Sequence, residues 1–403
     1  MEHRPGAGAE IKSRPALPGL PPQDPAPGRS MLGSRELREG LEGPMNVVPF
    51  AIVGAGWRAG FYARVALALP GLFRVTGVLT RDAGRAAHAS DAWGVPVRSS
   101  IDELLADRPN FVVLAVPRTA TPYLLHELAD ARVPVLAETP PAADFDGLAG
   151  LADLAASSAR IQVAEQYQFQ PHHAARLEVA RSGILGTVTQ AQVSVAHDYH
   201  GIDLLRRYLG VGFEPVTITA RRFASSIVAG PDRSGPPDRE RIEMSDQLLA
   251  WLDFGGRLGV YDFTPDQYFS WIRSPRVLVR GERGEIAGMT VRTLRDATTP
   301  VTLELARRDT GHDGNLEGLY LGGITLGDEW VYRNPFVPAR LADDEIAVAT
   351  CLSRMAAYVE GGPAFCSLAE AAWDHELGLR MAEAAESGLP VRADPQAWRP
   401  AIG

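Results

Sequence analysis

The chain has 403 residues, of which 45% are hydrophobic and 22% charged, and its formal net charge at pH 7 is −9. This length allows two domains with complete cores, and the composition is that of an ordinary globular protein. The acidic balance and the lack of a clustered basic stripe argue against nucleic acid as a partner. No run of about 18 apolar residues occurs, so we expect no membrane span.

The N-terminal segment differs from the rest of the chain. Its first 44 residues are rich in Pro and Gly and nearly lack aromatic and β-branched side chains. Such a segment cannot bury enough apolar area to offset its ordering entropy, and it has no apolar signal-peptide core. We expect residues 1–45 to be a disordered tail, or sequence that precedes an alternative start at Met45, in a cytoplasmic protein.

Two cysteines, Cys351 and Cys366, occur in the chain, and neither has a histidine at ligand spacing. We therefore expect two reduced thiols, with neither a disulfide framework nor a bound metal.

Strand and helix patterns alternate over residues 46–167. Strands are expected at 47–53, 73–80, 111–117, 133–138 and 161–165, and helices at 60–69, 100–107 and 120–131. Ser100 and Glu103 form a capping-box pattern at the start of the second of these helices. The strands are near-continuous apolar runs, as in a parallel sheet covered on both faces. Alternating βα units predict an α/β, doubly wound Rossmann domain.

The first predicted strand runs into Gly54-Ala55-Gly56-Trp57-Arg58-Ala59, and a helix pattern follows. Gly54 permits a tight turn, Gly56 lets the main chain approach a pyrophosphate, and Ala59 is small enough for the helix to pack on the strand. The start of the helix offers free N–H groups to phosphates. An ordinary βα turn would also use glycines, but the strand–turn–helix context favours a dinucleotide site that includes Trp57 and Arg58.

After Pro171 the pattern becomes that of an α+β domain, expected over residues 168–400. Helices are predicted at 171–182, 343–360 and 368–387, and strands at 187–197, 248–254, 257–263, 276–280, 301–305 and 324–332. Gly255-Gly256 between two of these strands is a hairpin signal, and 229–240, rich in Gly, Pro and charge, is expected to be a surface loop. We expect a large, mostly antiparallel, open-faced sheet with helices on its other face.

Together these segments resemble the Gfo/Idh/MocA family, the glucose–fructose oxidoreductase and inositol dehydrogenase group. The resemblance covers residues 46–395 and rests on motifs in a fixed order: Gly54-Ala55-Gly56, Val116-Pro117, Glu138-Thr139-Pro140, the segment 165–171, His200-Gly201-Ile202-Asp203 and Gly281-Glu282-Arg283-Gly284. It implies an oxidoreductase with NADP or NAD as cofactor, a carbohydrate-like small-molecule substrate, and a homodimer or homotetramer. The resemblance also implies cofactor contacts from Val116, Pro117, Thr121, Gln166 and, at the nicotinamide ribose, Glu138.

The sequence departs from the family pattern at its lysine. The family has Glu-Lys-Pro where this chain has Glu138-Thr139-Pro140, and that lysine is a proton donor or charge stabiliser beside the reacting carbon. Losing a charged donor of this kind typically costs about 3–4 kcal/mol of transition-state stabilisation. Three functions therefore stay open: a sugar or polyol dehydrogenase, a glycosidase or lyase that regenerates a tightly bound nucleotide, and a non-catalytic nucleotide binder.

The candidate acid–base groups follow a predicted strand, in His197-Asp198-Tyr199-His200. A histidine titrates near neutral pH and suits proton transfer. By resemblance His200 is the acid or base. Asp198 either orients a histidine or, as we favour, caps the following helix.

Other residues join this candidate site. Tyr167 is a candidate donor to the substrate, although buried aromatic packing accounts for it equally well, and Thr139 is expected to position the nicotinamide. His197, Tyr199 and Glu165 are assigned to the substrate site, although His197 equally fits a core position on the face of the preceding strand.

Cofactor choice depends on the end of the second predicted strand. Thr80 and Arg81 follow the fingerprint by about twenty residues, the usual reach to the adenine ribose. An acid at Thr80 would repel a 2′-phosphate, whereas the guanidinium of Arg81 suits one. A solvated arginine at a turn is the alternative, and we favour NADP over NAD.

A second polar and aromatic set lies in the C-terminal half: Tyr261, Asp262, Tyr268, Trp271 and Arg273. Such groups suit the face of a sugar or, equally, an oligomer interface on the exposed sheet.

Overall fold

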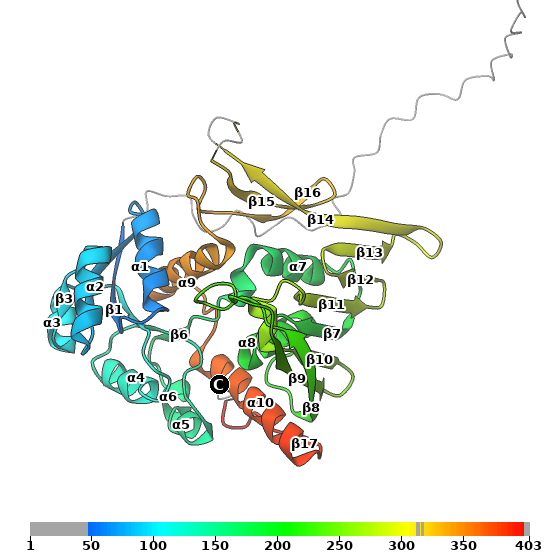
Figure 1. Ribbon diagram of the computed structural model, residues 1–403, viewed down its shortest axis with the longest axis horizontal. Helices are drawn as coiled ribbons and strands as arrows, with labels where there is room; N and C mark the ends of the chain where they lie inside the picture. Colours follow the sequence, from blue (N-terminus) through cyan, green and yellow to red (C-terminus); the bar gives the residue numbers. More distant parts are fainter. Residues whose placement is uncertain (1–46, 312–314, 316–317, 399–403) are drawn as a thin grey trace, which may run out of the picture. The chain divides into compact units, whose positions relative to one another are not determined.

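The computed structural model describes residues 47–311, 315 and 318–398; the predicted tail lies outside them. The first sheet is six-stranded and parallel, in the order β3-β2-β1-β4-β5-β6 (Figure 1). Its strands are β1 (Val48–Val53), β2 (Phe73–Leu79), β3 (Val97–Arg98), β4 (Phe111–Leu114), β5 (Val135–Ala137) and β6 (Ile161–Val163). This is the predicted doubly wound sheet. Strand order reverses between β1 and β4, where such sheets form a ligand crevice.

The helices of this half are α1 (Ala59–Ala68), α2 (Ala83–Trp93), α3 (Ile101–Ala106), α4 (Thr121–Asp130), α5 (Phe145–Ala149) and α6 (Ala152–Ala156). Ser100 caps α3 as predicted, because its Oγ accepts from the Glu103 N–H at 3.2 Å. The Glu103 carboxylate, however, accepts from the Ser99 N–H at 2.9 Å rather than from Ser100. Helix α2 escaped prediction because it buries only Ala89 and Trp93, which is too narrow a stripe to give a period.

The second sheet has eleven strands among the described residues, in the order β16-β15-β14-β13-β12-β11-β7-β10-β9-β8-β17. They are β7 (Val188–Ser194), β8 (Val216–Val228), β9 (Ile242–Asp253), β10 (Leu258–Phe263), β11 (Arg276–Gly281), β12 (Gly284–Ala287), β13 (Thr290–Leu294), β14 (Pro300–Thr310), β15 (Tyr320–Leu326), β16 (Glu329–Arg333) and β17 (Val391–Ala393). Described neighbours pair antiparallel except β7 with β10, so the predicted mostly antiparallel sheet is confirmed.

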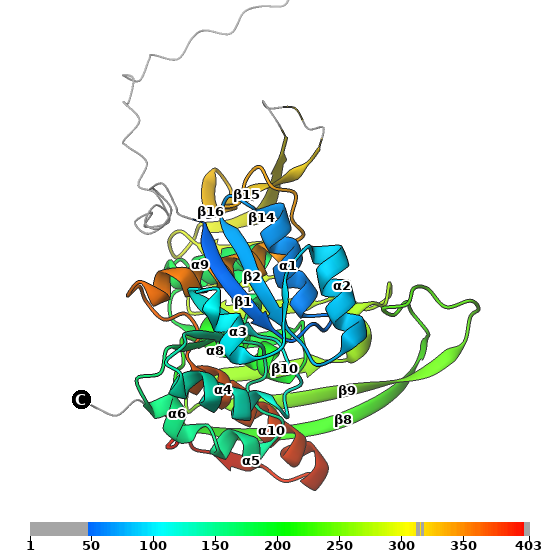
Figure 2. The ribbon, with the colours of Figure 1, turned by 90° about the vertical axis from the view of Figure 1, so that its left-hand side faces the viewer.

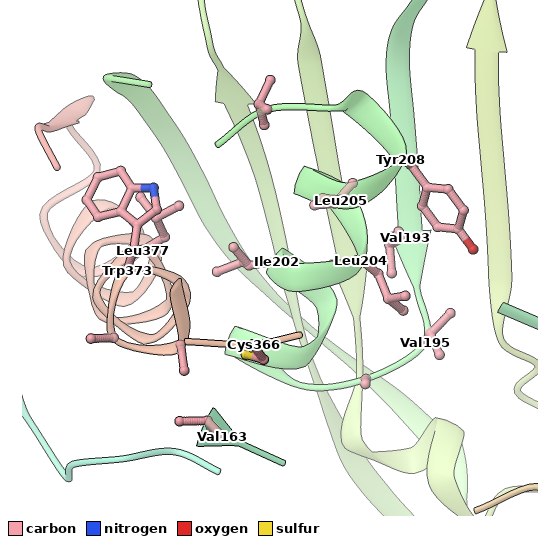
Figure 3. Packing of buried hydrophobic residues seen from close by; sticks show 14 of the residues in the cluster. Val163, Val193, Val195, Ile202, Leu204, Leu205, Tyr208, Cys366, Trp373 and Leu377 are labelled. Carbon is pink, nitrogen blue, oxygen red and sulfur yellow. The ribbon is translucent and has the colours of Figure 1, made fainter. Parts of the chain in front are cut away.

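Four longer helices accompany this sheet: α7 (Pro171–Arg181), α8 (Asp198–Leu209), α9 (Asp343–Val359) and α10 (Leu368–Ser387). Figure 3 shows Trp373 and Leu377 of α10 packed toward Ile202 of α8, with Val193 of β7 beyond them. Helix α8 is thus wedged between α10 and the sheet, and this packing fixes the position of its first turn.

Helix α9 packs elsewhere. Its buried residues Ile346 and Leu352 share a cluster with Phe50 of β1 and Phe111 of β4. A helix from the C-terminal part of the sequence therefore covers one face of the parallel sheet. The sequence-based division at 167/168 does not anticipate this exchange, and that boundary stays a prediction.

Two local predictions were wrong. The strand expected at 324–332 is a hairpin, since Gly327 adopts a φ of 62° and turns β15 into β16. The strand expected at 187–197 ends at Ser194, and His197 is the N-cap of α8. Asp198 is accordingly the first residue of α8 and not its cap.

Cys351 and Cys366 are both free and buried. None of the described helices is long and apolar enough to cross a membrane.

Candidate active site

The turn after β1 is built for close approach of a ligand to the main chain. Gly54 has a φ of +108°, and a Cβ there would lie 2.1 Å from the Ala115 carbonyl oxygen at the end of β4. Gly56 is different, because a Cβ on it would meet nothing within 4 Å. Gly54 therefore closes the turn against β4, whereas Gly56 leaves open space in front of the chain.

The same turn presents unpaired donors. Within the described part of the chain, the main-chain N–H groups of Gly56, Trp57 and Arg58 make no hydrogen bond. They precede α1, whose N-terminus carries a partial positive charge. The Nη2 atom of Arg58 is buried and also without a partner. Free amides at a helix N-terminus are what a pyrophosphate requires, so these residues fit a dinucleotide.

Glu138 lies beside this turn at the end of β5. Its Oε1 accepts a hydrogen bond from Arg58 Nε at 2.7 Å and another from the buried Tyr62 hydroxyl. Glu138 thereby fixes the arginine, and its second oxygen keeps the capacity to accept from a ligand. Tyr62 escaped sequence analysis because its position on α1 marks it only as core.

A buried acid–base pair lies just beyond the last strand of the same sheet. Glu165, two residues after β6, places Oε2 2.6 Å from Nδ1 of His200 in the first turn of α8, and the two side chains are 4% and 7% exposed. Burial raises the pKa of Glu165 to about 8 and lowers the pKa of His200 to about 3. Both shifts favour uncharged partners, so the pair shares one proton at neutral pH. His200 Nε2 remains for a substrate.

Two tyrosines surround the neighbouring histidine. The Tyr268 hydroxyl lies 2.6 Å from His197 Nδ1 and accepts from the His197 N–H at 3.0 Å, while His197 Nε2 lies 3.0 Å from the Tyr199 hydroxyl. Burial, followed by the proximity of His200, lowers the pKa of His197 to about 4. Assigned from these partners, the neutral imidazole accepts at Nδ1 and donates at Nε2 to Tyr199.

Tyr199 connects α8 to the parallel sheet. Burial raises its pKa, and a hydrogen bond from the side chain of Thr139 partly offsets this rise. Because the Tyr199 oxygen accepts from Nε2 of the neutral His197 at 3.0 Å, its own proton is free to be donated. A phenol donor therefore stands beside the position of the missing family lysine. Tyr167 also lies here, with its ring centroid 4.6 Å from that of His200.

At the end of the second strand, Thr80 and Arg81 follow β2 as predicted. Asp82 uses its carboxylate to cap α2, accepting from the Arg85 N–H at 2.8 Å. The side chains of Arg81 and Arg85 form no ion pair with any described residue. Two free guanidinium groups thus stand at this turn.

The comparisons with known proteins agree with this geometry. Residues 48–166 match the family model described as "Oxidoreductase family, NAD-binding Rossmann fold". This N-terminal part is a Gfo/Idh/MocA Rossmann domain. Over residues 48–166 the resemblance predicted from the motifs is thereby confirmed.

Solved structures with the Gfo/Idh/MocA architecture extend the likeness over both sheets. Levoglucosan dehydrogenase in complex with NADH and levoglucosan is 18% identical, with a TM-score of 0.62 over 86% of this chain and 99% of that one. An oxidoreductase from Agrobacterium radiobacter in complex with NAD+, L-tartaric acid and magnesium is also 18% identical, with a TM-score of 0.59 over 87% and 99%. A putative myo-inositol dehydrogenase from Sinorhizobium meliloti is 18% identical, with a TM-score of 0.58 over 86% and 99%. At such identities the likeness shows the fold. No curated protein matches the chain.

The remaining residues of the Gfo/Idh/MocA motifs take varied positions. Val116 and Pro117 follow β4, and the Thr121 hydroxyl is buried and donates to the Pro117 carbonyl at 3.4 Å. Gln166 is buried with an unpaired Oε1. Ala59 is fully buried at the start of α1, as close packing requires. Their contacts with a cofactor stay predictions.

Of the second polar and aromatic set, the structure brings Tyr268 into this site, whereas Trp271 is 80% exposed. Tyr268 lies 71 positions from His197 in the sequence. No local pattern reports such a distant contact. Gly201, by contrast, belongs to a motif that the sequence shows. A Cβ at this position would lie 2.6 Å from the Tyr261 ring, so the glycine leaves room for Tyr261, whose hydroxyl accepts a hydrogen bond from the Asp198 N–H.

We expect the Glu165–His200 pair to make stability depend on pH. Near neutral pH the folded pair holds one proton, whereas in the unfolded chain Glu165 has lost its proton above pH 4.5 and His200 loses its proton above pH 6.5. Between pH 6.5 and the folded pKa of about 8 the folded state binds more protons, so its stability falls as pH rises. At about 1.4 kcal/mol per unit and proton, the loss is about 1–2 kcal/mol.

Urea unfolding of the wild type and of Glu165→Gln at pH 6.5 and pH 8 measures this loss. The variant lacks the shared proton, and all other groups are common to both proteins. Parallel pH dependences of the two free energies of unfolding would contradict the assignment.

Proposed function

We propose that this protein is an NAD(P)-dependent oxidoreductase that transfers a hydride to or from a sugar, a polyol or a related small carbonyl compound. One observation carries the proposal. The first turn of α8 brings His200 and Tyr199 onto Glu165 and Thr139, which follow the last two strands of a parallel sheet whose first turn fits a dinucleotide. An acid–base pair thus stands at the sheet edge where a nicotinamide would lie.

When bound, the nicotinamide supplies the hydride acceptor or donor. Gly56 and the free amides before α1 would hold its pyrophosphate, with Arg58 and Glu138 beside them. His200 exchanges a proton at Nε2 with the oxygen of the reacting carbon. Glu165 holds Nδ1 and takes or returns the shared proton, and Tyr199 donates a hydrogen bond to the same oxygen.

An absorbance assay of nicotinamide reduction and oxidation with a panel of sugars, polyols and their ketones tests the proposal. The panel should include levoglucosan and inositol, because proteins of the same fold are named for them. Turnover with one member supports the proposal. Product formation without net change in a copurified nucleotide would instead identify a glycosidase or lyase, and binding without turnover a non-catalytic nucleotide binder.

We expect NADP to be preferred over NAD, because Arg81 has no ion partner and the carboxylate of Asp82 is occupied by its cap. Replacing Arg81 by Ala should weaken NADPH binding about tenfold or more, the effect of losing a hydrogen bond to a charged group, and leave NADH binding nearly unchanged. Fluorescence titration with both nucleotides measures this effect. Arg74→Ala, an exposed arginine at the opposite end of β2, is the control. Equal losses for both nucleotides would refute a 2′-phosphate site.

We further propose a homodimer or homotetramer that buries the open face of the large sheet. Exposed apolar side chains lie on this face, including Leu249 (38% exposed) and Trp251 (60% exposed). Monomeric proteins rarely expose large contiguous apolar patches, and most oligomers bury such a surface in a symmetric interface. A cytoplasmic location fits the two free buried thiols, Cys351 and Cys366.

A further inference from the structure

The hairpin of β8 and β9 extends far beyond the sheet that anchors it. Strand β10 pairs with β9 only over 248–253, and β17 pairs with β8 only over 216–218. Among the described strands, residues 223–228 and 242–247 therefore pair only with each other, and we call this part the distal ribbon. Figure 2 shows β8 and β9 running together well past β10. A two-stranded ribbon is at best marginally stable alone, so other contacts must hold it.

One set of contacts holds the ribbon from below. Ser245 of β9 is buried, and its hydroxyl lies 2.9 Å from that of Thr264 and donates to Asp266 in the short helix Pro265–Tyr268. Gly230, just after β8, approaches Ser270 so closely that a Cβ would lie 3.0 Å from its Cα. The ribbon and its loop therefore rest on the segment that supplies Tyr268 to the active site.

The loop at the end of the ribbon, residues 229–241, makes a further contact with the dinucleotide turn. The guanidinium carbon of Arg233 lies 4.2 Å from the centre of the Trp57 ring. Trp57 is 59% exposed and belongs to the run of residues with free main-chain amides. Arg233 forms no ion pair with any described residue, so this cation–π contact is its defined interaction.

Trp57 is itself part of a larger stack. Its ring meets that of Phe61 edge-on, with centroids 4.9 Å apart, and the guanidinium groups of Arg58 and Arg64 lie 5.0 and 4.4 Å from the Phe61 ring. Arg58 is fixed by Glu138. A displacement of the loop would therefore be transmitted through Trp57 and Phe61 to Arg58 at the dinucleotide turn.

We propose that Arg233 retains the nucleotide: its contact with Trp57 holds loop 229–241 across the phosphate-binding turn, so that a bound dinucleotide leaves only after this contact breaks. The proposal rests on the nucleotide binding assumed under the proposed function. Arg233 is a positioning residue, since it acts through Trp57, and its positive charge also favours an anionic ligand at the turn.

The rate of nucleotide release tests the proposal without any substrate. Purified protein is loaded with NADPH or NADH, and loss of its fluorescence is followed in stopped flow after mixing with excess oxidised nucleotide. Arg233→Ala should release the nucleotide about threefold to tenfold faster, the range expected for a cation–π contact. Arg239→Ala, an exposed arginine of the same loop, should match the wild type. Arg233→Lys, which keeps the charge, should lie between them.

A double-mutant cycle separates this contact from a general effect of charge. Trp57→Leu and Arg233→Ala remove the same contact, so the double variant should release the nucleotide no faster than the faster single variant. In the nucleotide-free protein, Trp57→Leu should also speed amide hydrogen exchange in residues 229–241, which activity does not influence.

An Arg233→Ala release rate equal to that of the wild type would overturn the proposal, as would fully additive effects of the two substitutions. Either result leaves the proposed function intact. If the wild type binds no dinucleotide, the proposed function and this inference both fail.

Discussion

Replacing His200 by Asn should lower kcat by about a hundredfold to ten thousandfold, the range for loss of a positioned general acid or base. Asparagine keeps a polar side chain of similar reach but cannot exchange a proton. Because Nδ1 of His200 is taken up by Glu165 at 2.6 Å, its Nε2 is aligned for the substrate before binding. Steady-state kinetics with the best substrate of the panel measures this effect, and the KM should change much less than kcat.

The pH dependence of the two reaction directions sharpens this prediction. The Glu165–His200 pair holds one proton below the pKa of about 8 that burial gives Glu165. In that state Nε2 carries a hydrogen and acts as an acid; above it the ionised Glu165 accepts from Nδ1 and Nε2 is a base. Oxidation of an alcohol should therefore rise through pH 8, and reduction of a carbonyl should fall over the same range.

Glu165→Gln should abolish the opposite pH dependences of oxidation and reduction near pH 8. A glutamine still accepts from Nδ1, but no shared proton remains to be titrated near pH 8. His126→Asn, an exposed histidine that contacts the Gly150 carbonyl, is the control and should behave like the wild type. A His200→Asn variant with wild-type kcat, or unchanged pH profiles in Glu165→Gln, would exclude the pair from catalysis.

The parallel sheet was predicted well because the strand and the helix of each βα unit are marked by patterns within their own short segments. Apolar runs mark β1, β2 and β4 as strands buried on both faces, and α10 begins and ends where its apolar pattern does. Elements with little burial were missed. Residues 221–224 of β8 are all exposed, and its partner β9 begins only after a loop rich in Gly, Pro and charge, so no sustained period of two emerges over the ribbon.

The active site was predicted only in part, for a related reason. Motif order placed His200, Glu165 and Tyr199 in one region, but their hydrogen bonds depend on how α8 is packed between α10 and the sheet. Tyr268 contacts His197, and Arg233 contacts Trp57, from segments far away in the sequence that come close only in the folded chain. Contacts of this kind, between distant segments, produce no characteristic residue spacing from which they could be predicted.

Replacing Gly54 by Ala should mainly lower stability, whereas replacing Gly56 by Ala should mainly weaken dinucleotide binding. Gly54→Ala forces a side chain into a φ of +108° and onto the Ala115 carbonyl oxygen, at 2.1 Å. We expect a loss of about 1–3 kcal/mol in the free energy of unfolding from backbone strain, with more where the main chain cannot yield. Gly56→Ala meets nothing within 4 Å and should unfold like the wild type.

Nucleotide binding reverses this order of severity. The methyl group of Gly56→Ala occupies the open space that the pyrophosphate needs and would keep the ligand from a main-chain N–H, and losing a hydrogen bond to a charged group costs about 1.5–3 kcal/mol. We therefore expect Gly56→Ala to weaken dinucleotide binding about tenfold to a hundredfold while its Tm stays at the wild-type value. Thermal unfolding without nucleotide and calorimetric titration with NADPH and NADH separate the two effects. Full affinity in a stable Gly56→Ala protein would mean that the open space in front of Gly56 does not receive the nucleotide.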